Sequence, residues 1–163
     1  MSEAAEIARK ALSRGDLIGA YDATVSAIEA GDESGAIRHQ QILALARMGD
    51  TERAMQKFAD YGLKGSSNVD ERTIGARILK DRAFNTPAGP ARQAAMELAF
   101  AAYHDVYEAT RDSFPGINAA TLALLAGREA ESRALAEALL ADPEVAAPGD
   151  YWKAATRAEA LLL

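Results

Sequence analysis

The chain has 163 residues, of which 49% are hydrophobic but only 6% aromatic, and it carries a formal net charge of −6. The length fits one domain with a sizeable core, and the acidic balance opposes a nucleic-acid partner, which needs a basic surface. Cysteine is absent from the sequence, which excludes disulfides, thiol catalysis and thiolate zinc sites. Because much of the hydrophobic fraction is alanine, the best helix former, we predict an all-α fold with closely packed helices.

The first six residues, Met1 to Glu6, carry acidic side chains where a signal peptide carries basic ones. No apolar run approaches the roughly 20 residues that span a bilayer. We therefore expect a cytoplasmic protein without a membrane partner.

Hydrophobic residues recur at helical spacing in four segments of the first 62 residues. The predicted helices run over residues 3–13 and 17–30, then to Met48, and then to about Tyr61. Glycine and aspartate form the turns between them, at Gly15-Asp16, Gly31-Asp32 and Gly49-Asp50.

The turns at Gly15-Asp16 and Gly49-Asp50 are 34 positions apart (49 minus 15), and the alanines Ala20 and Ala54 repeat at the same distance. This is the period of a tetratricopeptide repeat, in which pairs of antiparallel helices stack on one another. The tryptophan and the closing proline of the full repeat pattern are missing, so an irregular bundle of helix hairpins is the alternative.

Five more helices follow in the rest of the chain. After a loop at 62–68, Asn68 and Glu71 resemble a capping box, and Asp150 is placed to cap the last helix. The predicted ranges are 69–84, 90–112, 117–127, 128–140 and a final helix from 151, with a loop at 142–149. We predict a tetratricopeptide-like α-solenoid of about nine helices in antiparallel pairs, with the ninth unpaired.

The stretch from Phe114 to Gly127 organises this second half. We expect Pro115 and Gly116 to end the preceding helix, because proline lacks an amide donor and glycine tolerates a turn. The helix after them is almost wholly apolar and therefore buried. Asn118 is expected at its start, where unpaired N–H groups and the helix dipole would favour a ligand or a structural cap.

Several short motifs in the second half of the chain follow one another in an order that is typical of one family. They are Ala76-Arg77-Ile78-Leu79-Lys80-Asp81, then Tyr103, then Pro115-Gly116-Ile117-Asn118, then Asp150-Tyr151-Trp152. This order resembles the tetratricopeptide-type sensor domain, also called the TRAFs-binding domain. That domain lies in the central regulatory region of animal apoptosis signal-regulating kinases and in many bacterial signalling or immunity proteins. The resemblance implies a regulatory module that couples a bound partner, or a nucleotide-derived ligand, to an effector.

On this basis we treat the chain as one domain, 1–163, with two repeat-like helix pairs in 1–62 and the sensor-like region in 69–163. The predicted ligand contacts lie on the first helix of each pair: Arg77, Lys80, Asn118, Tyr151, Trp152 and Thr156. Asp81, Tyr103, Pro115 and Gly116 are the predicted structural positions. Two cations, two positive helix ends and an aromatic pair suit an anionic, ring-bearing ligand such as a nucleotide.

Each residue also has a simpler explanation. Arg77 and Asp81 are four apart and fit a surface ion pair, and Lys80 fits a solvated surface position. Asn118 fits a plain cap, and Tyr103 and Trp152 fit core aromatics.

The sequence contains no recognisable set of catalytic residues. The two histidines, His39 and His104, lie on different predicted helices, and no carboxylates are arranged around them in a metal-ligand pattern. We therefore predict a protein that is not an enzyme and needs no metal or cofactor. The first hypothesis is a sensor or scaffold domain with an attached effector. The alternative is a plain protein-interaction or oligomerisation module. The three terminal leucines, Leu161 to Leu163, predict either a longer parent chain or packing on a second subunit.

Overall fold

The computed structural model describes residues 2–147 and 149–163, and these residues form α-helices and one short 3₁₀ helix but no strand. The all-α prediction is confirmed. The elements are α1 (Glu3–Ser13), α2 (Leu17–Glu29), α3 (Gly35–Arg47), α4 (Thr51–Asp60), η1 (Leu63–Gly65), α5 (Val69–Asn85), α6 (Pro90–Thr110), α7 (Ser113–Leu125), α8 (Glu129–Ala141), α9 (Pro143–Ala146) and α10 (Tyr151–Ala160).

Two of these elements fall in segments predicted to be loops. The 3₁₀ helix η1 lies within 62–68, and α9 is a single turn within 142–149. Asp142 begins α9 by accepting a hydrogen bond from the Glu144 amide at 2.8 Å. Pro143 then occupies the first helical position, where its missing N–H costs nothing. The predicted ninth helix is therefore α10.

The chain divides into two compact units, Met1–Ile78 and Leu79–Leu163. Helix α5 is continuous across this boundary, so its first part belongs to the N-terminal unit and its last part to the C-terminal unit.

In the N-terminal unit, helices α1 to α4 pack in sequence as hairpins, and α1 also packs on α3. The two turns predicted to be equivalent are built alike. Gly15 and Gly49 both have left-handed φ angles, 79° and 87°. The following residues, Asp16 and Asp50, each cap the next helix by accepting from a backbone amide three residues on, at 2.9 and 3.2 Å.

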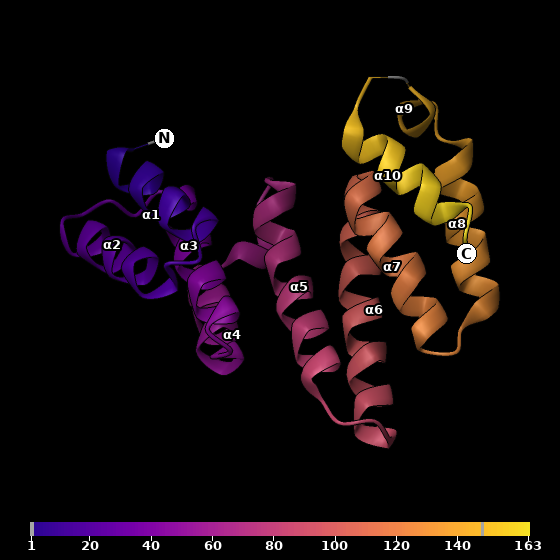
Figure 1. Cartoon of the computed structure of the whole chain (residues 1–163), viewed down its shortest axis with the longest axis horizontal. Helices are drawn as coiled ribbons and strands as arrows, with labels where there is room; N and C mark the ends of the chain where they lie inside the picture. The colour runs from indigo at the N-terminus through magenta and orange to yellow at the C-terminus, as the bar shows by residue number, and fades with distance from the viewer. Residues whose placement is uncertain (1, 148) are drawn as a thin grey trace. The chain divides into compact units, whose positions relative to one another are not determined.

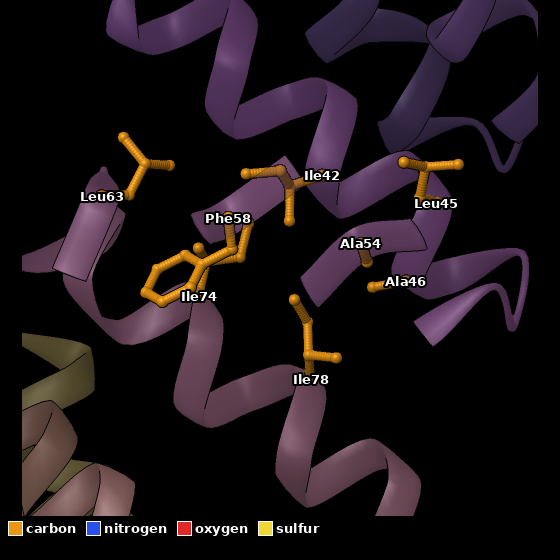
Figure 2. Packing of buried hydrophobic residues seen from close by; sticks show 8 residues of the cluster. All are labelled: Ile42, Leu45, Ala46, Ala54, Phe58, Leu63, Ile74 and Ile78. Carbon is orange, nitrogen blue, oxygen red and sulfur yellow. The ribbon is translucent and has the colours of Figure 1, made fainter. Parts of the chain in front are cut away.

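One core cluster of the N-terminal unit consists of apolar side chains from α3, α4, η1 and α5 (Figure 2). Its members are Ile42, Leu45, Ala46, Ala54, Phe58, Leu63, Ile74 and Ile78. Gly75 lies within this packing, because a Cβ there would be 2.7 Å from the Phe58 ring. The first part of α5 is therefore fixed by the N-terminal core. Asn68 caps it as predicted, accepting from the amides of Asp70 and Glu71.

In the C-terminal unit, α6, α7 and α8 pack side by side, and α10 lies across α7 and α8 (Figure 1). Helix α6 buries an aromatic-rich stripe formed by Met96, Phe100, Tyr103 and Tyr107. Helix α7 buries residues on most sides, as its apolar sequence predicted. None of the helices in the described ranges combines the length and the apolar character needed to cross a bilayer.

Candidate functional site

The beginning of α7 differs from the prediction. Helix α6 ends at Thr110, followed by Arg111 in a left-handed conformation (φ 56°), and Asp112 caps α7 by accepting from the Phe114 amide at 2.9 Å. Helix α7 therefore starts at Ser113, so Pro115 and Gly116 lie inside its first turns and do not end α6. Pro115 is tolerated there because the first-turn amides have no partner within the helix.

Asn118 consequently is not the cap of α7. It lies more than one turn into the helix, and its Nδ2 donates to the Phe114 carbonyl at 2.8 Å. This bond leaves the Oδ1 atom of Asn118 directed to a partner outside the helix.

Gly116 is required by packing. A Cβ at this position would lie 2.8 Å from Cδ2 of Tyr107 on α6 and 3.0 Å from a methyl carbon of Leu139 on α8. Both neighbours are buried. Glycine therefore lets α7 approach α6 and α8 closely.

The centre of the candidate site is a contact between Lys80 of α5, Asn118 of α7 and Tyr103 of α6, all in the C-terminal unit. The Lys80 Nζ donates to the Asn118 Oδ1 at 2.7 Å and lies 5.4 Å from the centroid of the Tyr103 ring. Lys80 and Asn118 are half-buried, while Tyr103 is only 1% exposed. Three helices therefore hold one ammonium group in a fixed place, and Lys80 is not a fully solvated residue.

Arg77 and Asp81 do not form the ion pair that was the simpler explanation: none of the ion pairs among residues 2–147 and 149–163 joins them. Arg77 belongs to the N-terminal unit, where its charge acts on His39 of α3. Burial lowers the pKa of His39, and Arg77 lowers it further, while the carboxylates of Asp70 and Glu71 act in the opposite direction.

The predicted contacts on α10 are divided between surface and core. Tyr151 and Trp152 are each 75% exposed, with their rings edge to face at a centroid distance of 5.2 Å. The core position considered for Trp152 is wrong, whereas Tyr103 does lie in the core. Thr156 is buried. Asp150 caps α10 as predicted, accepting from the Lys153 amide at 3.0 Å.

Two surface pockets of the C-terminal unit were not predicted. One, of about 260 Å³, lies among the end of α5, the start of α6 and the end of α7; its lining residues are Phe84, Ala88, Gly89, Arg92, Gln93, Met96 and Leu125. The other, of about 390 Å³, is lined by Leu79, Arg82 and Thr86 of α5 and by Ala91, Ala94, Ala95 and Leu98 of α6. Both pockets are formed by residues from separate helices, so no single segment of the sequence indicates them.

Within the described ranges, no group of three or more histidine, cysteine, aspartate or glutamate side chains is arranged so that it could hold a metal ion. His104 lies 3.8 Å from a carboxylate oxygen of Glu108, one turn along α6. Its ring is also near that of Phe100.

The hairpins, the repeated Gly-Asp turns and the close helix packing define a tetratricopeptide-like α-solenoid. A solved structure with this fold is TTC0263, a thermophilic TPR protein of Thermus thermophilus. It is 13% identical, the match covers 98% of each chain, and the TM-score is 0.68.

The family described as Tetratricopeptide Repeats-Sensor matches residues 16–123, more than half of the sequence. The chain therefore belongs to this family. The match includes Lys80, Tyr103 and Asn118 and ends before α10. No curated protein matches the chain.

Proposed function

We propose that this chain is a non-enzymatic sensor and scaffold domain. It binds an anionic, nucleotide-derived ligand or a segment of a protein, and it passes the bound state to an attached effector domain. Tetratricopeptide repeats generally serve as protein-interaction scaffolds, and membership of the sensor family supports this role. The choice of an anionic ligand rests on the contact of the Lys80 ammonium with Asn118 and Tyr103.

The observation that carries the proposal is the Lys80–Asn118 hydrogen bond over the Tyr103 ring. A lysine side chain normally loses much rotamer freedom when it binds an anion. Here that loss has already occurred on folding, because Asn118 and Tyr103 hold the ammonium in place. Such a group binds a phosphate or carboxylate through a charge-assisted hydrogen bond with little further ordering.

The remaining predicted contacts of the C-terminal unit lie on α10. Tyr151 and Trp152 offer exposed aromatic faces at the start of this helix, whereas Thr156 is buried. The two rings and the Lys80 ammonium are the groups that the proposal assigns to the ligand.

A thermal-shift screen of the purified chain against nucleotides, cyclic dinucleotides, ADP-ribose and sugar phosphates tests the proposal. A ligand at a hundred times its Kd stabilises by about 2.7 kcal/mol, which raises the Tm by about 5–10 °C for a chain of this size. The variant Lys80→Met should lose the shift. The control is Lys57→Met, because the Lys57 ammonium also lies over a tyrosine ring, Tyr61 at 5.5 Å, but in the N-terminal unit. An unchanged shift in Lys80→Met would contradict the proposed site.

A second candidate is a protein-interaction or oligomerisation module without a small ligand. It is favoured by the apolar side chains exposed on and after α10: Tyr151, Trp152, Leu161 and Leu162, which are 67–85% exposed. Light scattering coupled to size-exclusion chromatography distinguishes the two. A concentration-dependent dimer that Leu162→Asp converts to a monomer, together with no ligand in the thermal screen, would favour this second function.

A further inference from the structure

The smaller pocket and the proposed anion site lie on the same faces of the same two helices. Phe84 follows Lys80 by four residues on α5, and Leu125 follows Asn118 by seven residues on α7. Residues at these spacings share a helix face. At a rise of about 1.5 Å per residue, the pocket begins about 6 Å beyond the lysine along α5 and about 10 Å beyond the asparagine along α7.

The pocket has the chemistry of a ring-binding site. Phe84 and Leu125 are each 46% exposed although they are large and apolar, and the buried Met96 also lines the pocket. The Arg92 guanidinium lies 5.9 Å from the centroid of the Phe84 ring. Arg92 takes part in none of the ion pairs formed among residues 2–147 and 149–163, so its planar group is available to stack on or bond to a ligand.

The volume of the pocket restricts what it holds. Drug-sized ligands occupy sites of roughly 300–1,000 Å³, and this pocket has about 260 Å³. It therefore fits a single ring system. The remainder of a longer ligand must extend along the helices toward Lys80.

A carboxylate near that path limits the charge of the ligand. On α7, Thr121 lies three residues after Asn118 and donates to the Glu159 carboxylate of α10 at 2.5 Å. A carboxylate accepts hydrogen bonds from hydroxyl groups but repels further phosphates. The surroundings thus favour one phosphate on a hydroxylated linker over a triphosphate.

We infer that the ligand class of the proposed sensor site is an aromatic ring joined by a short hydroxylated linker to a single phosphate. The ring occupies the Phe84–Arg92 pocket, and the phosphate accepts a hydrogen bond from the Lys80 ammonium, which Asn118 holds in place. This inference rests on the proposed function, since it needs the anion site at Lys80.

Isothermal titration calorimetry tests this ligand class with four probes: adenosine 5′-monophosphate, ribose 5-phosphate, adenosine and adenosine triphosphate. Stacking of a base contributes roughly tenfold to a hundredfold in affinity. The monophosphate should therefore bind about 10–100 times more tightly than ribose 5-phosphate, and also more tightly than adenosine triphosphate.

The variants separate this inference from the proposed function. Phe84→Ala should reduce the affinity for the monophosphate to that for ribose 5-phosphate and leave ribose 5-phosphate unaffected, whereas Lys80→Met should weaken both. The control is Leu98→Ala, which truncates an exposed apolar residue of the other pocket. A Tm measured without ligand shows that each variant is folded.

If ribose 5-phosphate binds as tightly as the monophosphate and Phe84→Ala changes neither affinity, the ring pocket is refuted while the anion site stands. If the probes bind equally to the wild type and to Lys80→Met, or if none binds, the anion site fails and the inference fails with it.

Discussion

Replacing Gly116 with alanine tests whether the packing of α7 depends on a missing side chain. The added Cβ would lie 2.8 and 2.9 Å from two carbons of the Tyr107 ring and 3.0 Å from Leu139 Cδ2. Neither neighbour can move into solvent, because they are 6% and 1% exposed. Alanine gains about 1 kcal/mol of helix propensity over glycine, whereas overpacking a core costs about 1–3 kcal/mol. Because the clash involves side chains from two other helices, we expect the cost to prevail by about 1–2 kcal/mol.

The assay is urea unfolding followed by circular dichroism, together with a calorimetric Tm. A loss of this size lowers the Tm by about 2–8 °C for a chain of this length. The matched control is Gly65→Ala in η1, where the new Cβ meets no atom within 4 Å. The control should be neutral or more stable by up to about 1 kcal/mol. If Gly116→Ala were as stable as the control, the helices would relax at little cost, and the packing argument would be wrong.

Three further predictions concern other positions. Gly75→Ala places a Cβ 2.7 Å from the Phe58 ring, so urea unfolding should show a loss of about 1–2 kcal/mol; no loss relative to Gly65→Ala would contradict the packing of the N-terminal core. Burial lowers the pKa of His39 below its ordinary value, so the unfolded chain binds the proton first. Stability should fall as the pH drops from about 7.5 to 5 in the wild type more than in His39→Gln, and parallel urea-derived curves would refute this. Asn118→Asp gives Lys80 a carboxylate partner in place of an amide. Calorimetry should therefore show that anion binding is lost, while the Tm measured without ligand is kept or raised. Retained anion binding would argue against Lys80 as the anion contact.

Most of the helices could be predicted because their determinants are local. Glycine with a positive φ followed by an aspartate cap ends one helix and begins the next, and apolar residues at helical spacing mark what lies between. The start of α7 could not be predicted in this way. Pro115 and Gly116 usually interrupt a helix, but a proline in the first turn does not, and the actual break depends on the left-handed Arg111. A left-handed residue other than glycine is rare, so the sequence gives little warning of it.

The candidate site could be predicted only in part, because its contacts join distant segments. The sequence predicts Lys80 and Asn118 as separate ligand contacts, but their hydrogen bond spans 38 positions and depends on how α5 and α7 pack. The sequence leaves Trp152 open between a ligand contact and a core position, because aromatic residues are usually buried. Residues 151–154 include no buried residue, so the core position is wrong. The ring pocket was missed because its lining comes from three helices, each with an ordinary amphipathic pattern.

Helix α5 gives the sensor hypothesis a physical basis for communication along the chain. Its first part contributes Ile74 and Ile78 to the core of the N-terminal unit, and its last part carries Lys80 and Phe84. A helix is a cooperative element, since each backbone hydrogen bond depends on the order of the residues around it. A ligand that stabilised the last turns of α5 would therefore also stabilise the turns that complete the N-terminal core. One continuous helix can in this way link a bound ligand to the stability of a segment that does not touch it.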